Sequence, residues 1–232
     1  RRRSRGRRRA LLTIDLTTAV MDEAVESDAD LIVAYHPPIF GGLKQLRTTD
    51  SLQRSLMRAV ARGISVYSPH TAADAAPGGV NDWLAEAVGD IRAIEPLRPT
   101  EDDPRAGAGR LVQLATPAPL STIVSRVKAH LALDHVRVAS PADDPEIARV
   151  AVCPGAGGSL FEGHRGANLY LTGEMRHHDV LARVAADQCV ILTDHTWCER
   201  GWLPRLAEAL RARVPALEVR VSTRDADPLA VV

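Results

Sequence analysis

Short apolar runs alternate along the chain with longer stretches in which apolar residues recur every three or four positions. Runs of this kind are typical of buried strands, and the three-to-four spacing is typical of amphipathic helices. The clearest run is residues 30–35, Asp-Leu-Ile-Val-Ala-Tyr. The clearest helix spans about residues 50–62, where Leu52, Leu56 and Val60 share one face and Asp50 can cap the first turn.

The same alternation continues through both halves of the chain and predicts an α/β fold. Strands are expected at residues 10–16, 30–35, 64–67, 110–115, 135–139, 148–153, 167–171, 189–193 and 217–221. Helices are expected between them, ending near Val25 and spanning about residues 50–62, 80–88, 120–131, 176–186 and 199–213. Strands that alternate with helices form mostly parallel sheets flanked by helices, joined by right-handed crossovers.

One stretch without periodicity divides this pattern. Residues 95–108 are rich in Pro, Asp, Arg and Gly, so a linker is predicted there. The expected organisation is an Arg-rich disordered tail at residues 1–9, an N-terminal α/β lobe at 10–94, the linker at 95–108 and a C-terminal α/β lobe at 109–232. Because the two halves share a similar layout, two related lobes are expected.

Charge is balanced overall but uneven along the chain. Lys plus Arg and Asp plus Glu are both 29, so the net charge gives no global attraction to nucleic acid or to an anionic membrane. The first nine residues are almost all arginine, and such a run is expected to be disordered. A transit peptide, a nuclear signal, a solvated tail and an incomplete chain all fit this run, and the lack of an initial Met favours an incomplete chain. Aromatic residues are only 3%, which disfavours a nucleic-acid-binding module.

Membrane and secretory signals are not found in the sequence. No stretch approaches the roughly 20 apolar residues that span a bilayer, and no secretory apolar region is present. The cysteines Cys153, Cys189 and Cys198 are far apart, which fits a reducing compartment. We therefore expect a cytoplasmic protein, with a mitochondrial or nuclear location left open by the arginine run. Cys153 and Cys189 are interpreted as small buried residues, whereas Cys198 lies inside a candidate site.

Polar side chains gather where the predicted strands end. In open α/β sheets, ligands bind outside the carboxyl ends of the strands. If the strands are parallel, these side chains face one side of their sheets. The residues at such ends are His36, His70, Asp74, Glu174, Asp194 and His195.

Among these, His195 and Glu199 have the spacing that places two side chains on one face of a helix. An imidazole and a carboxylate so placed can share a cation, although most such pairs are surface or capping pairs. His36 lies in a loop stiffened by Pro37 and Pro38, which suits a ligand as well as a turn histidine. Asp74 is a candidate ligand or turn residue.

Two further segments carry chemistry. His70 is a candidate acid–base group, or a residue that orients a ligand. The turn at residues 155–159, Gly-Ala-Gly-Gly-Ser, can present backbone N–H groups to phosphate, but no Lys follows it and tight strand-to-helix packing is the preferred interpretation. The adjacent His177 and His178 point in different directions on a helix, so orienting or helix-start roles are favoured over joint metal binding.

Read together, six separated segments resemble the GTP cyclohydrolase 1 type 2 (Nif-three-like) family. They are residues 30–40, 70–84, 107–111, 155–159, 171–178 and 195–201, they occur in the family's order, and they cover nearly the whole chain from about Leu11. The chain looks like the shorter, eukaryotic-type branch. The resemblance implies a two-lobed α/β fold, a two-metal centre between the lobes and a toroidal homohexamer.

The resemblance also implies which residues bind metal. It carries metal binding onto His36, Asp74, His195 and Glu199. Histidine and carboxylate ligands suit Zn, Fe, Mn or Ni, and one or two ions per chain are expected. Many bacterial relatives have two adjacent histidines where this chain has Tyr35 and His36. A phenol with an unperturbed pKa near ~10 is a poor ligand at neutral pH, which puts the second ion in question.

Two function hypotheses follow from different classes. The first is a metal-dependent hydrolase acting on a nucleotide or a heterocyclic small molecule, with His70 or Glu174 as the catalytic group that moves the proton. The family name suggests opening of a guanine ring, but resemblance does not identify a substrate. The alternative is a non-catalytic, metal-stabilised oligomeric scaffold or a transcription-related interaction protein, since the family's name derives from an interaction with a transcriptional factor.

Overall fold

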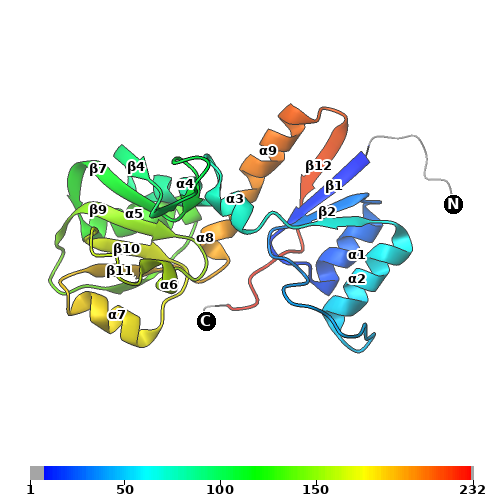
Figure 1. Ribbon diagram of the computed structural model, residues 1–232, viewed down its shortest axis with the longest axis horizontal. Helices are drawn as coiled ribbons and strands as arrows, with labels where there is room; N and C mark the ends of the chain where they lie inside the picture. Colours follow the sequence, from blue (N-terminus) through cyan, green and yellow to red (C-terminus); the bar gives the residue numbers. More distant parts are fainter. Residues whose placement is uncertain (1–7, 231–232) are drawn as a thin grey trace. The chain divides into compact units, whose positions relative to one another are not determined.

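The computed structural model describes residues 8–230 and shows two compact units (Figure 1). One unit comprises the residues up to His70 together with those from Trp202 onward, and the other comprises Thr71–Gly201. The expectation of a disordered tail at residues 1–7 lies outside the described residues. Within residues 8–230, no helix is long and apolar enough to cross a bilayer.

The first unit is built on a four-stranded parallel sheet in the order β12-β1-β2-β3. Its strands are β1 (Arg8–Thr13), β2 (Leu31–Ala34), β3 (Ser65–Tyr67) and β12 (Leu217–Val221), and its helices are α1 (Thr18–Glu26), α2 (Ser51–Arg62) and α9 (Leu203–Arg213). Helices α1 and α2 lie on one side of this sheet and α9 on the other (Figure 1). The predicted helix cap is confirmed, because the side chain of Asp50 accepts the N–H of Gln53 at 2.8 Å.

Two predicted boundaries in this unit differ from the structure. Arg8 and Arg9 belong to strand β1 and not to a disordered tail, because Asp30 and Glu218 contact their side chains and strands β12 and β2 pair with β1 on both sides. Strand β12 was expected in the C-terminal lobe, yet it completes the sheet of the first unit. The unit to which a strand belongs is thus determined by its backbone pairing with distant segments and not by its position along the chain.

The second unit is built on a six-stranded mixed sheet in the order β4-β7-β9-β10-β11-β8. Strands β9, β10 and β11 are parallel, and the other neighbours are antiparallel. The bounds are β4 (Ile91–Glu95), β7 (Arg110–Pro119), β8 (Arg137–Ala139), β9 (Glu146–Cys153), β10 (Leu169–Thr172) and β11 (Cys189–Leu192). Every residue of β10 and β11 is buried, as expected for strands covered on both faces.

The helices of this unit precede, connect and follow these strands. They are α3 (Thr71–Ala75), α4 (Val80–Ala85), the 3₁₀ helix η1 (Glu86–Val88), α5 (Leu120–Leu131), α6 (Gly158–Phe161), α7 (His177–Val184) and α8 (Trp197–Arg200). Phe161 of α6 and Val180 of α7 pack with Tyr170 of β10 in one apolar cluster. The predicted α/β class with parallel-rich sheets flanked by helices is therefore confirmed.

The segment predicted as a linker has structure of its own. Residues 95–108 include the small antiparallel pair β5 (Arg98–Pro99) and β6 (Gly107–Ala108), and they lie inside the second unit. The buried side chain of Arg110 donates to the carbonyls of Gly107 and Gly109 at 2.7 and 2.8 Å, which ties this segment to β7. The division between the compact units falls instead at His70/Thr71 and at Gly201/Trp202.

Candidate metal centre

In the second unit, His195 and Glu199 face one another at the carboxyl end of β11. The Nε2 atom of His195 lies 3.6 Å from Oε1 of Glu199, a separation too long for a hydrogen bond. Glu199 lies in α8 and its side chain is only 3% exposed, while that of His195 is half-buried. A buried carboxylate is costly unless it is paired or binds a cation, and an imidazole nitrogen with a carboxylate oxygen suits a divalent ion.

Glu174 contacts the other ring nitrogen of the same histidine. Its Oε2 lies 3.3 Å from Nδ1 of His195. A neutral imidazole that donates from Nδ1 has its lone pair on Nε2, the atom that faces Glu199. Metal-binding histidines commonly donate their second nitrogen to a carboxylate in this way. The structure thus places Glu174 where it orients His195.

Gly155, in the turn after β9, contacts the segments that carry Glu174, His195 and Glu199. Its N–H donates to Sγ of Cys198 at 3.1 Å, and its carbonyl accepts the N–H of Glu174 at 2.9 Å and the hydroxyl of Thr172 at 3.1 Å. With a φ of +61°, a Cβ at this position would lie 2.7 Å from Oε1 of Glu199 and 3.0 Å from Nε2 of His195. Only glycine fits here, which supports the packing interpretation of this turn.

Cys198 joins that turn to the histidine. Its thiol donates to the carbonyl of His195 at 2.9 Å while accepting from Gly155. Burial raises the pKa of the Cys198 thiol well above its usual range, and the charge of Glu199 adds to this effect. The thiol therefore stays protonated and remains a hydrogen-bond donor at neutral pH.

Asp74 lies in α3, near the same group of side chains. Burial raises the pKa of Cys153 to about 12, and the negative charges of Asp74 and Glu199 add to the shift, which places both carboxylates near this thiol. The segment that carries Asp74 is held by Arg110, which forms an ion pair with Asp82 and reaches the carbonyl of Ala76 at 3.5 Å.

In the first unit, His36 has a carboxylate partner of its own. Its Nδ1 lies 3.0 Å from Oδ1 of Asp15, the same arrangement as His195 with Glu174. The ring of His70 lies 5.8 Å from that of His36, and His70 has a φ of +40°, an uncommon conformation for a residue other than glycine. Tyr35 is 3% exposed and packs against both imidazoles.

The predicted site residues thus fall into two groups. His36 and His70 lie together in the first unit, and Asp74, Glu174, His195 and Glu199 belong to the second. The side chains of His177 and His178 are exposed at the start of α7, apart from these contacts.

Sequence reasoning missed three supporting residues. Asp15 was placed inside a strand, although a single carboxylate in the apolar run Ile14-Asp15-Leu16 was a usable signal. The roles of Cys198 and Arg110 depend on turn geometry and on contacts between distant segments, and no local pattern reveals them.

Comparison with known proteins identifies the family of the chain. Residues 2–228 match the family Duf34/NIF3 (NGG1p interacting factor 3). The protein NIF3 homolog of Schizosaccharomyces pombe is 44% identical over 94% of this chain and 83% of its own length. The NGG1-interacting factor 3 of Saccharomyces cerevisiae is 40% identical over 96% of this chain and 81% of its own length.

A solved structure has the same fold. The Bacillus cereus protein related to NIF3 superposes with a TM-score of 0.83 at 21% identity, covering 97% of this chain and 90% of that one. Sequence match over nearly the full length and close agreement of the fold lead to one conclusion. The chain belongs to the Duf34/NIF3 family.

Proposed function

We propose that this protein is a metal-dependent hydrolase that binds a divalent ion. The observation that carries the proposal is His195, whose Nδ1 contacts Glu174 and whose Nε2 faces the buried carboxylate of Glu199. Asp15 and His36 repeat the same carboxylate–histidine arrangement in the first unit. The proposed ligands are His36, Asp74, His195 and Glu199.

These donors fit the ion by their chemistry. Two imidazoles and two carboxylates suit Zn, Fe, Mn or Ni, and a bound ion of this kind supplies Lewis acidity that activates water and polarises a substrate. Glu174 holds His195 in the tautomer whose lone pair lies on Nε2, the atom that faces Glu199. Because that contact already engages Glu174, His70 is the better proposed group for moving a proton.

The substrate class is the less specific part of the proposal. A nucleotide or another heterocyclic small molecule is proposed from the family resemblance. Fold and family alone do not identify a substrate, so the assay must sample several nucleotides in addition to GTP.

Elemental analysis tests the metal. Purified wild-type protein should carry at least one divalent ion per chain, and His195→Ala should lose most of it. His178→Ala is the matched control, since this histidine is exposed on α7 and should leave metal content unchanged. Equal metal content in wild type and His195→Ala would remove His195 from the site.

Hydrolysis tests the reaction. Protein reconstituted separately with Zn, Fe, Mn or Ni should release product from at least one nucleotide, and His70→Ala should lower kcat while metal content stays constant. Metal-loaded protein that turns over none of the substrates would favour the second candidate function.

That second candidate is a protein-interaction role. The loop between β2 and α2 exposes large apolar side chains, with Phe40 85%, Leu46 60% and Ile39 51% exposed. Exposed apolar groups gathered in one loop are typical of binding surfaces. The Saccharomyces cerevisiae relative is named for an interaction with NGG1. Phe40→Ser should then weaken partner capture and leave metal content unchanged.

A further inference from the structure

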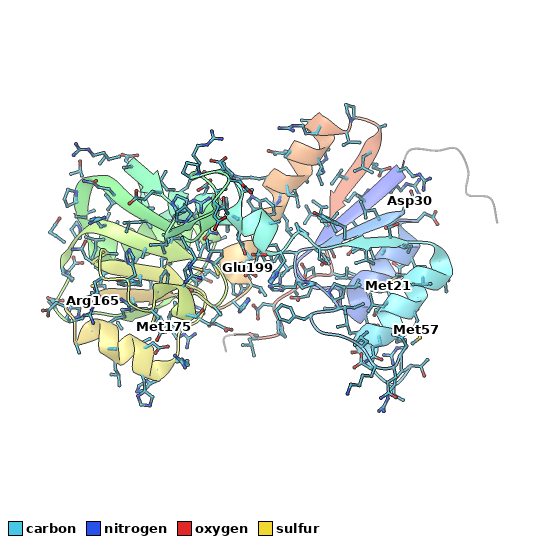
Figure 2. The ribbon with its side chains drawn as sticks, in the orientation of Figure 1. Met21, Asp30, Met57, Arg165, Met175 and Glu199 are labelled. Atoms are coloured by element: carbon cyan, nitrogen blue, oxygen red, sulfur yellow. The ribbon has the colours of Figure 1, made fainter. Side chains whose placement is uncertain are left out.

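A second feature of the second unit is a cleft of about 310 Å³ beside helix α7. It lies where α7, the edge strand β8 and strand β11 meet, and Figure 2 labels Met175 in this region of the unit. Its apolar lining consists of Val138, Ala139, Met175, Val180, Val190 and Leu192. The volume lies at the lower end of the range of small-molecule sites.

The cleft adjoins the residues that position His195. Leu192 is the last residue of β11, at the carboxyl end that leads directly into His195. Met175 directly follows Glu174, which contacts Nδ1 of His195. Sites of bound ligands in α/β sheets are found at such carboxyl ends.

A second connection runs through the edge strand. Arg137 pairs in register with Leu192, and its Nη2 donates to Asp194 at 2.6 Å. Asp194 has a φ of +61° and directly precedes His195. The wall of the cleft is thus tied to the proposed metal ligand on two sides, through Glu174 and through Asp194.

The polar groups of the cleft indicate the charge of its ligand. Arg137 and His177 complete the lining, and no carboxylate is among the lining residues within the described chain. The ion pair of Arg137 with Asp194 is largely exposed, at 67% and 42%, so it is weak and can exchange for a ligand anion. The guanidinium carries five N–H donors, enough to contact both an anion and Asp194.

From these observations we infer that the cleft binds a small molecule with an aromatic or heteroaromatic ring and an anionic substituent. The ring packs against the apolar walls and the anion lies at Arg137 and His177. This inference rests on the proposed function, because it assigns the substrate of the proposed hydrolase to a cleft whose lining residues Met175 and Leu192 are near Glu174 and His195 in the chain.

Two fluorescent probes of identical ring system test the inference. The probe 8-anilinonaphthalene-1-sulfonate carries the anion, and N-phenyl-1-naphthylamine lacks it. Wild-type protein should bind the sulfonate with one site per chain, at least tenfold more tightly than the neutral probe. Arg137→Gln should reduce that preference to near unity.

Filling the cleft should abolish binding. Val180→Phe adds bulk to the lining, and Leu181→Phe, next to it on α7, adds similar bulk to a side chain that is 51% exposed and outside the lining. Val180→Phe should weaken binding of the sulfonate at least tenfold, and Leu181→Phe should not. If Val180→Phe fails to fold, Ala139→Leu fills the same cleft from β8.

The outcomes separate this inference from the proposed function. Titrations are run on chelator-treated and on metal-loaded protein, with metal content measured in parallel. Equal binding by Val180→Phe and Leu181→Phe overturns the cleft as the site, and equal affinity for the two probes overturns the anionic ligand. Sulfonate binding that appears only when the protein is diluted also overturns the inference, because a second copy of the chain would then cover the cleft at higher protein concentration. Protein that holds no metal but still binds the sulfonate probe counts against the proposed hydrolase and not against the cleft.

Discussion

Gly155 lies where any side chain would collide with two of the proposed ligands. Gly155→Ala would place a Cβ 2.7 Å from Oε1 of Glu199 and force a left-handed φ of +61° on alanine. We expect a loss of roughly 1–2 kcal/mol in the free energy of unfolding from the backbone alone, and a loss of metal binding from the collision. Denaturant unfolding and elemental analysis measure the two effects.

Gly163 provides the matched control. Its φ is +75°, and a Cβ added there would have no neighbour within 4 Å. Gly163→Ala should therefore show a similar loss of stability with unchanged metal content. If both variants keep their metal, the contact predicted at Gly155 does not affect the site.

The cysteines provide a second test at the residue scale. Burial raises the pKa of Cys153 to about 12, and it also raises the pKa of Cys198 well above its usual value. At pH 8 only about one Cys153 thiol in ten thousand is then ionised, and the thiolate is the reactive form. Mass spectrometry after iodoacetamide treatment at pH 8 should find both cysteines unmodified in folded protein and modified in denaturant. Rapid modification of folded protein would contradict the raised pKa values of the two thiols.

Among the elements, helix α1 holds the segment that follows β12. The carboxylate of Glu23 accepts hydrogen bonds from both the backbone and the hydroxyl of Thr223, from the hydroxyl of Ser222 and from the backbone of Arg224. Burial raises the pKa of Glu23, but these hydrogen bonds outweigh it and the net pKa lies below its ordinary value. Glu23→Gln should lower the free energy of unfolding by about 1–2 kcal/mol at pH 7.

The sign of this shift predicts the pH dependence. Because the pKa is lower in the folded protein, the stabilisation is fully present above the unfolded value near ~4.3 and is lost as pH falls through the folded value. The difference between wild type and Glu23→Gln should therefore shrink in acid. Glu26→Gln is the control on the same helix, because the exposed pair of Glu26 with Arg224 should contribute little. A difference that is constant with pH would contradict the role of the Glu23 charge.

Local patterns predicted most elements of this fold. The helix expected at residues 120–131 and the strand expected at 217–221 match α5 and β12 residue for residue. The apolar spacing that predicts each of them lies within the segment itself. The helix expected at 199–213 is instead divided into α8 and α9 at Gly201 and Trp202. A Cβ on Gly201 would lie 2.4 Å from the ring of Trp83, a contact that no local pattern reveals.

Sheet order was less predictable, because pairing joins segments that are distant in the sequence. Strand β12 pairs with β1 across about two hundred residues. In the second unit the neighbours β4–β7, β7–β9 and β11–β8 are antiparallel, whereas mostly parallel pairing was expected. For the site, the spacing of His195 and Glu199 was informative, although His195 lies in the turn before α8 and only Glu199 lies on that helix. Asp15 lies just after a strand and Gly155 lies in a turn. At such positions a shift of one residue changes every contact, so the sequence pattern did not reveal their roles.

At the scale of the whole molecule, the family resemblance predicts a ring of six chains. Light scattering at several protein concentrations should give a mass near six times the 25.0 kDa of one chain. Phe40→Ser tests whether the exposed apolar loop contributes, since removing an exposed apolar anchor weakens association. Lys44→Ser, an exposed polar residue of the same loop, is the control. A monomer at every concentration would contradict the predicted ring.

The last prediction is that His36 and His195, which belong to different compact units, bind the same ion. A ligand that binds only the folded state stabilises it by about 2.7 kcal/mol at a hundredfold excess over its dissociation constant. Chelation should therefore lower the Tm, and His36→Ala or His195→Ala should each lower it by a similar amount. The double variant should add little to either single change, because both act through the same ion.

Asp74→Ala and Glu199→Ala extend the same cycle within the second unit. Each should reproduce the effect of the chelator, and neither should respond to further chelation. His178→Ala should have the Tm of the wild type and keep its response to chelator. Such a result would show that loss of a histidine is not by itself the cause of a lower Tm. Protease cutting near His70/Thr71 and Gly201/Trp202, where the compact units divide, should rise in every variant that loses the ion. Additive effects of His36→Ala and His195→Ala, together with a Tm that ignores the chelator, would show that the two histidines do not bind a common ion.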